Sequence, residues 1–232
     1  MSITTHGWQV LDEGKALLIR EYSIGPGNTS NCVVARVGDG ELMVLSPTAK
    51  VDDGALKDLE AFGTVTSLVA PNGFHRTGLR PWLDALPHAA VYGPQAALPR
   101  VRAMVPAAQD LQGLADRMPE GLALLPLPSM RVGGTWLVAE TDGGLTWCVG
   151  DTITNQDEYL FGIGWMLKLV GIKRGFAMNG LQGLAMARDK PAYFEWLRAR
   201  LSDGAPTTIV PAHGTVVERA DLGETLSRWF AG

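Results

Sequence analysis

Residues 145–151, "LTWCVGD", form an apolar run that ends in a glycine and an aspartate. The β-branched and aromatic residues of this run favour a buried strand, and the loop just past such a strand is a common place for functional side chains. Two further runs are built in the same way: residues 65–78, "VTSLVAPNGFHRTG", lead to His75, and residues 207–214, "TTIVPAHG", lead to His213. We therefore expect the aspartate and both histidines in loops that directly follow strands.

The segments around these runs predict a mixture of strands and helices. Short apolar runs separated by glycine-containing turns predict strands over residues 16–24, 31–37, 41–47, 65–71, 89–94, 122–128, 135–141, 145–151 and 207–213. Apolar residues at helical spacing predict helices over residues 52–63, 78–86, 156–172, 175–188, 190–201 and 219–232. This order of segments indicates two sheets faced by helices, an α+β or α/β sandwich, in a single domain over residues 1–232.

The composition limits the kinds of partner. The 232 residues carry a formal net charge of -4, which argues against a basic groove for nucleic acid and against a basic patch for an anionic membrane. No segment has the roughly 18 apolar residues that a membrane span needs, and residues 1–20 lack the pattern of an export signal. We expect a cytoplasmic protein whose partner is a small-molecule substrate or ligand.

Four other residues of metal-binding type have ordinary structural interpretations. Cys32 and Cys148 lie in apolar runs without CxxC spacing, which favours buried thiols over a zinc ribbon or a redox motif. His6 lies near the N-terminus and His88 lies at the start of a predicted strand, so both are expected at the surface.

His75, Asp151 and His213 together offer two imidazoles and one carboxylate. Such a set suits zinc or iron and leaves coordination positions open for water or substrate. Each residue also has a structural alternative. His75 can be a loop residue that bonds the backbone, Asp151 can cap the segment that follows it, and His213 can tie the last strand to the sheet edge.

The segments "CVGDTI" and "IVPAHG", with a histidine loop after an earlier strand and a series of short strands at the start, resemble the metallo-β-lactamase fold superfamily. The order of elements resembles that family over nearly the whole chain. The resemblance implies an α+β fold, a four-layer αββα sandwich with two mixed β-sheets flanked by helices, and a family made up mostly of metal-dependent hydrolases. In this comparison Asp151 matches the family's bridging aspartate and His213 matches its last histidine.

The first metal loop departs from the family pattern, His-x-His-x-Asp-His-x-Gly-Gly. When the last histidine of that pattern is aligned with His75, Ala70, Asn72 and Phe74 stand where the family has His, His and Asp. The family's middle histidine ligand falls near Met130. The resemblance therefore implies a divergent branch with a degenerate metal-binding motif, in which the first of two metal sites is absent.

The resemblance thus implies one set of ligands for a single zinc or iron ion, formed by His75, Asp151 and His213. His75 and Asp151 are then the expected catalytic residues. Asn72, Phe74 and Met130 are the expected substrate-binding positions. Three protein ligands hold zinc more weakly than four, so a metal-free protein is one expected outcome of purification.

Two functions remain open from the sequence. The first is a mononuclear metal-dependent hydrolase of an ester, thioester or amide. The second is a catalytically inactive family member that binds a small molecule or a protein. Residues 159–186 are rich in methionine and aromatic residues, which favours a place in the core, with a homodimer interface through these residues as the alternative.

Overall fold

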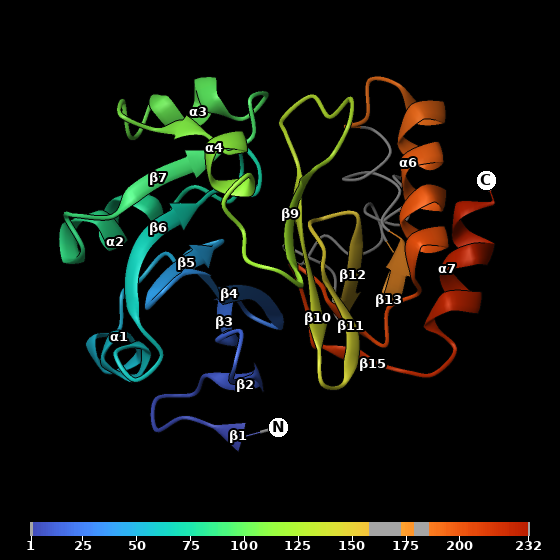
Figure 1. Ribbon diagram of the computed structural model, residues 1–232. Coiled ribbons are helices and arrows are strands. Elements are labelled where there is room, and N and C mark those ends of the chain that lie inside the picture. Colours follow the sequence, from blue (N-terminus) through green and yellow to red (C-terminus); the bar gives the residue numbers. More distant parts are fainter. Residues whose placement is uncertain (1, 158–172, 179–185, 232) are drawn as a thin grey trace. The chain divides into compact units, whose positions relative to one another are not determined.

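Residues 2–157, 173–178 and 186–231 are described by the computed structural model, in which the chain divides into two units (Figure 1). Unit 1 consists of Met1–Arg20, Cys32–Pro126 and Val132–Thr135. Unit 2 consists of Glu21–Asn31, Leu127–Arg131 and Trp136–Gly232. His75 belongs to unit 1, whereas Asp151 and His213 belong to unit 2. A single domain over residues 1–232 stays a prediction.

The first sheet follows the chain order from β1 to β8. Its strands are β1 (Ser2–Ile3), β2 (Gln9–Asp12), β3 (Leu17–Gly25), β4 (Asn28–Gly38), β5 (Glu41–Leu45), β6 (Thr64–Val69), β7 (Ala90–Gly93) and β8 (Gln109–Asp110). β5 pairs antiparallel with β4 and parallel with β6, and β7 pairs parallel with both β6 and β8. Leu68 and Val69 of β6 are fully buried, and such continuous apolar runs are typical of parallel strands. The strands predicted between residues 16 and 94 are confirmed as β3 to β7.

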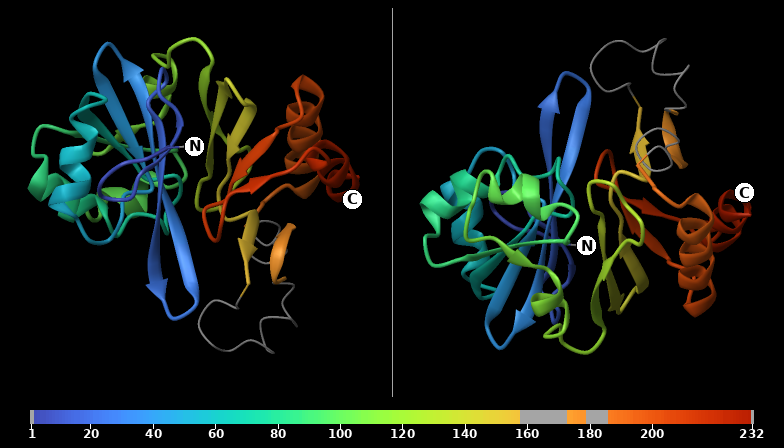
Figure 2. Two further views of the ribbon diagram at one scale, coloured as in Figure 1. Left: turned by 90° about the horizontal axis from the view of Figure 1, so that it is seen from below. Right: turned by 90° about the horizontal axis from the view of Figure 1, so that it is seen from above.

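Four short helices accompany this sheet: α1 (Asp53–Leu59), α2 (Leu79–Ala85), α3 (Leu98–Arg102) and α4 (Gln112–Ala115). Figure 2 shows α1 and α2, in teal and green, beside the strands of this sheet. α1 begins after Asp52, whose carboxylate accepts the Ala55 N–H at 3.1 Å. This hydrogen bond and the neighbouring Arg20 lower the pKa of Asp52. The helices predicted over 52–63 and 78–86 are thus confirmed as α1 and α2, and β9 (Leu122–Pro126) follows α4.

In unit 2 four strands lie in the order β15 (Val217–Glu218), β14 (Thr208–Val210), β11 (Gly144–Cys148) and β10 (Thr135–Thr141). β10 and β11 form the predicted hairpin, in which Thr141 pairs with Gly144. β14 pairs parallel with β11 and antiparallel with β15, so this sheet is mixed. In this parallel pair Cys148 lies opposite Val210, so the carboxyl ends of both strands lie at the same edge of the sheet.

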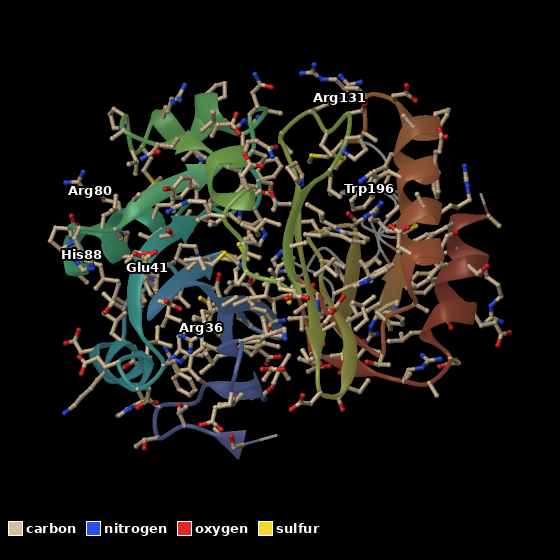
Figure 3. All side chains as sticks on the ribbon, in the orientation of Figure 1. Arg36, Glu41, Arg80, His88, Arg131 and Trp196 are labelled. Atoms are coloured by element: carbon tan, nitrogen blue, oxygen red, sulfur yellow. The ribbon has the colours of Figure 1, made fainter. Side chains whose placement is uncertain are left out.

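α6 (Lys190–Asp203) and α7 (Leu222–Phe230) confirm the last two predicted helices. Trp196 of α6 points toward the strands in Figure 3, and its ring lies edge-on to the ring of Trp136 with 5.0 Å between their centroids. Trp136 in turn lies 5.4 Å from Trp147 of β11. A row of three indoles therefore joins α6 to the sheet of unit 2.

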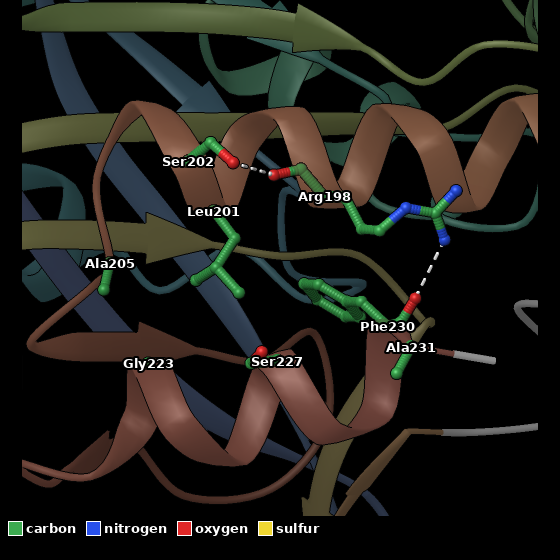
Figure 4. A pocket seen from close by; sticks show the side chains of 8 residues that line it. All are labelled: Arg198, Leu201, Ser202, Ala205, Gly223, Ser227, Phe230 and Ala231. Atoms are coloured by element: carbon green, nitrogen blue, oxygen red, sulfur yellow. Dashed lines mark hydrogen bonds between the residues drawn. The ribbon is translucent and has the colours of Figure 1, made fainter.

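α6 and α7 also contact each other along a groove of about 490 Å³ (Figure 4). Arg198 Nη1 donates a hydrogen bond to the Phe230 carbonyl at 3.0 Å across this groove. A Cβ atom at Gly223 would lie 2.9 Å from the Cβ of Ala205. A glycine at this position therefore lets α7 approach the end of α6.

The helix predicted over 175–188 is wrong in its first turn and at its end, where Ala187 forms a backbone bridge with Met130. Gly175–Met178 form β13, which pairs antiparallel with β12 (Ile153–Gln156) and sets Ile153 opposite Met178. Apolar spacing over a few residues does not separate a helix from a buried strand, and here pairing with a partner strand satisfies the backbone. Gln156 is likewise a strand residue, while 158–172 and 179–185 lie outside the described residues, as does most of the interface predicted over 159–186.

The two cysteines confirm their sequence interpretation. Cys32 and Cys148 are free and fully buried, and burial raises the pKa of each thiol to about 12. Such thiols stay protonated and unreactive at neutral pH. Within the described ranges, no helix is both long enough and apolar enough to cross a membrane.

Candidate metal centre

The loop that follows β6 is shaped by Asn72, a buried residue with 5% of its surface exposed. Its side-chain oxygen accepts the backbone N–H groups of Phe74 at 2.8 Å and of His75 at 3.1 Å. The Gly73 N–H donates to the Val132 carbonyl at 2.8 Å. The amide oxygen of Asn72 is therefore a structural acceptor that folds the loop and sets the backbone of His75.

Ser46 fixes the imidazole of His75. This serine directly follows β5, is buried, and has a left-handed backbone with φ of 57°. Its hydroxyl lies 2.8 Å from His75 Nδ1, and its own N–H donates to the Val69 carbonyl at the end of β6. Two neighbouring parallel strands thus support the ring, and a metal bond from this histidine would use Nε2.

Phe74 lies on the surface of the same loop, with 47% of its area exposed. The Arg100 guanidinium lies 5.0 Å from the centre of its ring, a distance that allows a cation–π contact. Arg76 Nη1 donates to the Arg100 carbonyl at 2.9 Å. At the position where the family resemblance places an aspartate, this chain therefore has an exposed ring with basic neighbours.

Asp151 and His213 meet in unit 2. They follow β11 and β14, which are parallel neighbours, and the Val149 N–H extends the pairing to the Val210 carbonyl at 2.8 Å. Asp151 Oδ1 lies 3.1 Å from His213 Nε2, and the two side chains are 14% and 9% exposed. Loops past the carboxyl ends of adjacent parallel strands are the usual place for binding residues in such sheets.

The contact of the other ring nitrogen of His213 indicates which nitrogen of the ring carries hydrogen. His213 Nδ1 lies 3.1 Å from the Thr29 carbonyl, which can only accept a hydrogen bond. Nδ1 therefore carries the hydrogen, and in the neutral ring the lone pair of Nε2 faces the carboxylate of Asp151. Two acceptors at this distance attract each other only when a proton or a metal cation lies between them.

Met130 also belongs to unit 2. It is 8% exposed and forms an isolated backbone bridge with Ala187, next to Ser129, whose carbonyl accepts the Arg188 N–H at 2.7 Å. At the place where the resemblance puts the family's middle histidine, this chain has a buried thioether.

The remaining two histidines lie at the surface, as expected. His6 Nδ1 pairs with Asp58 Oδ1 at 2.7 Å. His88 is exposed at the edge of Figure 3, and its Nε2 lies 3.1 Å from the Val65 carbonyl. Sequence reasoning missed Ser46 and Thr29, which orient the two candidate ligands His75 and His213. A serine and a backbone carbonyl carry no motif that could have singled them out.

Comparisons with known proteins support the fold. No family model and no curated protein matches the sequence. Similar solved structures include the metallo-β-lactamase FIM-1 from Pseudomonas aeruginosa in its mono-zinc form, at 10% identity and a TM-score of 0.55, covering 92% of this chain and 95% of that chain. A metallo-β-lactamase from Pontibacter korlensis is 12% identical with a TM-score of 0.53, covering 91% and 92%. A peroxy diiron form of the chemotaxis sensor ODP is 15% identical with a TM-score of 0.54, covering 92% and 91%. The two mixed sheets with their helices are therefore those of the metallo-β-lactamase fold.

Proposed function

We propose that this chain is a mononuclear metal-dependent hydrolase of an ester, thioester or amide, with His75, Asp151 and His213 as the ligands of one zinc or iron ion. The observation that carries the proposal is the Asp151–His213 pair, in which a carboxylate oxygen and an imidazole nitrogen, both of a kind that binds metal, lie 3.1 Å apart with little exposure to solvent. Solved structures of the same fold include a mono-zinc and a diiron protein.

The residues fit a metal of this kind. Each of the three offers one ligand atom, an imidazole nitrogen or a carboxylate oxygen, and such donors suit zinc and iron. An ion held there would polarise the scissile carbonyl and make water a better nucleophile. Ala70, which is fully buried, and Met130 offer no ligand comparable to imidazole, so we propose one ion and not two.

The contribution of the chain itself is orientation. Thr29 holds His213 in the form whose Nε2 points at Asp151. Ser46 holds Nδ1 of His75. We propose that Asp151 also accepts a proton from water, as a general base in addition to its role as ligand. We propose a small-molecule substrate, in keeping with the net charge of -4.

The test is metal content by mass spectrometry on protein without a histidine tag, before and after incubation with zinc or iron(II) and removal of excess ion. The wild type is expected to hold close to one ion per chain. His75→Ala, Asp151→Asn and His213→Gln should each lose most of it. His88→Ala is the matched control, because it removes an exposed histidine that bonds a backbone carbonyl. Equal metal content in all five proteins would contradict the proposal.

A second function is favoured by the loop of unit 1. Phe74 is exposed beside Arg100, and fully buried Ala70 stands at a former ligand position. An exposed ring with basic neighbours suits an acidic or aromatic ligand in a protein that has lost its metal. A wild type that takes up no zinc or iron, but whose binding of such a ligand is weakened by Phe74→Ala, would favour this binding module over the hydrolase.

A further inference from the structure

We propose that Asn31 is a positioning residue for His213, and that it holds the loop of residues 211–214 so that Nε2 of the histidine faces Asp151. The purpose of this arrangement rests on the proposed function. The contacts that carry the inference lie within unit 2 and join residues that are about 180 positions apart in the sequence.

Asn31 uses its side chain to bind both ends of the loop. Its Nδ2 atom donates to the Pro211 carbonyl at 2.8 Å and to the Gly214 carbonyl at 2.7 Å. The side chain is 3% exposed, so water does not compete for these bonds. Its backbone N–H donates to the Ala212 carbonyl at 2.9 Å. One buried residue therefore binds three of the four carbonyls in the loop.

Neighbouring residues complete this set of bonds, which we call the clasp. Ser30 Oγ donates a second hydrogen bond to the Ala212 carbonyl at 2.9 Å. The Asn155 N–H of β12 donates to the His213 carbonyl at 3.0 Å. Every carbonyl from residue 211 to residue 214 thus accepts a hydrogen bond, and the backbone on both sides of the histidine has no room to shift without breaking one.

The same short segment also holds the imidazole. Thr29, Ser30 and Asn31 are consecutive residues of β4, and the Thr29 carbonyl accepts from His213 Nδ1 at 3.1 Å. Gln156 Nε2 donates to this carbonyl at 3.1 Å and fixes its direction. Because the backbone bonds and the ring bond come from one segment, a loop released by loss of Asn31 would move the ring away from Thr29.

Only a carboxamide of this length can make the two side-chain bonds. Aspartate has the same shape but donates nothing, so it would place a carboxylate against two carbonyl oxygens. Alanine would leave both carbonyls buried and unpaired. The clasp is therefore a specific use of asparagine at a strand position where asparagine is otherwise disfavoured.

The test is the tautomer of His213 in metal-free protein, read from long-range ¹H–¹⁵N spectra of the imidazole. The wild type is expected to show the form with hydrogen on Nδ1. Asn31→Ala should give a mixture of both forms. Asp189→Ala is the matched control, since it removes the cap of α6 in the same unit and leaves the clasp untouched. An unchanged tautomer in Asn31→Ala, or a wild type without hydrogen on Nδ1, would overturn the inference.

Two further measurements keep the test decisive. If Asn31→Ala does not fold, couplings across the hydrogen bonds from Asn31 Nδ2 to the carbonyl carbons of Pro211 and Gly214 are measured in the wild type, and their absence would refute the clasp. Cobalt(II) titration then separates this inference from the proposed function. Asn31→Ala should bind cobalt about tenfold or more weakly than the wild type and the control. A wild type that binds no cobalt but shows the tautomer effect would end the hydrolase proposal and leave the positioning role of Asn31 intact.

Discussion

The loop of residues 70–78 in unit 1 and the loop of residues 211–214 in unit 2 hold their histidines in different ways. The first loop is folded mainly by one amide oxygen, that of Asn72, and exposes the ring of Phe74. The second has every carbonyl bonded and lies almost wholly inside the protein. The first is also the loop that departs from the family pattern at several positions. In the first loop a side-chain oxygen accepts from the backbone, whereas in the second a side-chain nitrogen donates to it.

The largest loss of stability is expected for Gly214→Ala, in the loop of residues 211–214. Gly214 has φ of +89°, and a Cβ there would lie 1.7 Å from the Asn155 carbonyl oxygen. We expect a loss of more than about 4 kcal/mol in the free energy of unfolding, measured by urea titration. Gly7→Ala is the control that separates backbone strain from steric overlap. Gly7 has the same φ, but no atom lies within 4 Å of its Cβ position. It should lose only about 1 kcal/mol, and equal losses in both variants would mean that the overlap is relieved.

One substitution in each loop then compares the loss of a side-chain donor, at Asn31, with the retention of a side-chain acceptor, at Asn72. Asn31→Asp removes two donated hydrogen bonds inside the protein and should reduce the free energy of unfolding by about 3 kcal/mol or more. Asn72→Asp keeps an oxygen that accepts from Phe74 and His75, so both of these hydrogen bonds should survive and the loss of free energy of unfolding should be smaller than for Asn31→Asp. Both are measured by urea titration at neutral pH. The reverse order would show that the two loops have been ranked wrongly.

A smaller effect is expected for the exposed ring of the first loop. A double-mutant cycle with Phe74→Ala and Arg100→Ala should give a coupling of about 0.5–1 kcal/mol, the usual strength of a cation–π contact at a surface. The free energy of unfolding of all four proteins is compared. No measurable coupling would mean that the ring and the guanidinium are only neighbours.

The last prediction concerns the buried thiols, one in each unit. Burial raises the pKa of Cys32 and Cys148 from 9.0 to about 12, so the unfolded chain releases these protons first. Their contribution to stability is therefore complete below pH 9 and is lost as the pH rises toward 12. At pH 8, iodoacetamide should modify neither thiol in folded protein and both in urea. Modification of only one in the folded protein would identify the unit that opens more readily.

The sequence predicts much of this molecule where the signal is local. Apolar runs with turn residues give β3 to β7, β10 and β11, and the positions after β6, β11 and β14 give the three candidate ligands. The pairing of β12 with β13 was missed because it joins segments whose apolar spacing also suits a helix. The clasp around His213 was missed because Asn31 and Gly214 meet only when strands far apart in the chain come together. The sequence pattern of neither segment predicts that contact.

The row of Trp136, Trp147 and Trp196 gives unit 2 an optical signature of its own. Indoles in contact at these distances, tilted or edge-on to one another, couple their electronic transitions, so the intense far-ultraviolet indole band of this unit should appear in circular dichroism as an oppositely signed pair. Trp8 and Trp82 of unit 1 instead bond separate backbone carbonyls, those of Ala55 and Thr48. The packing of α6 on its sheet can therefore be followed by light alone, without any label.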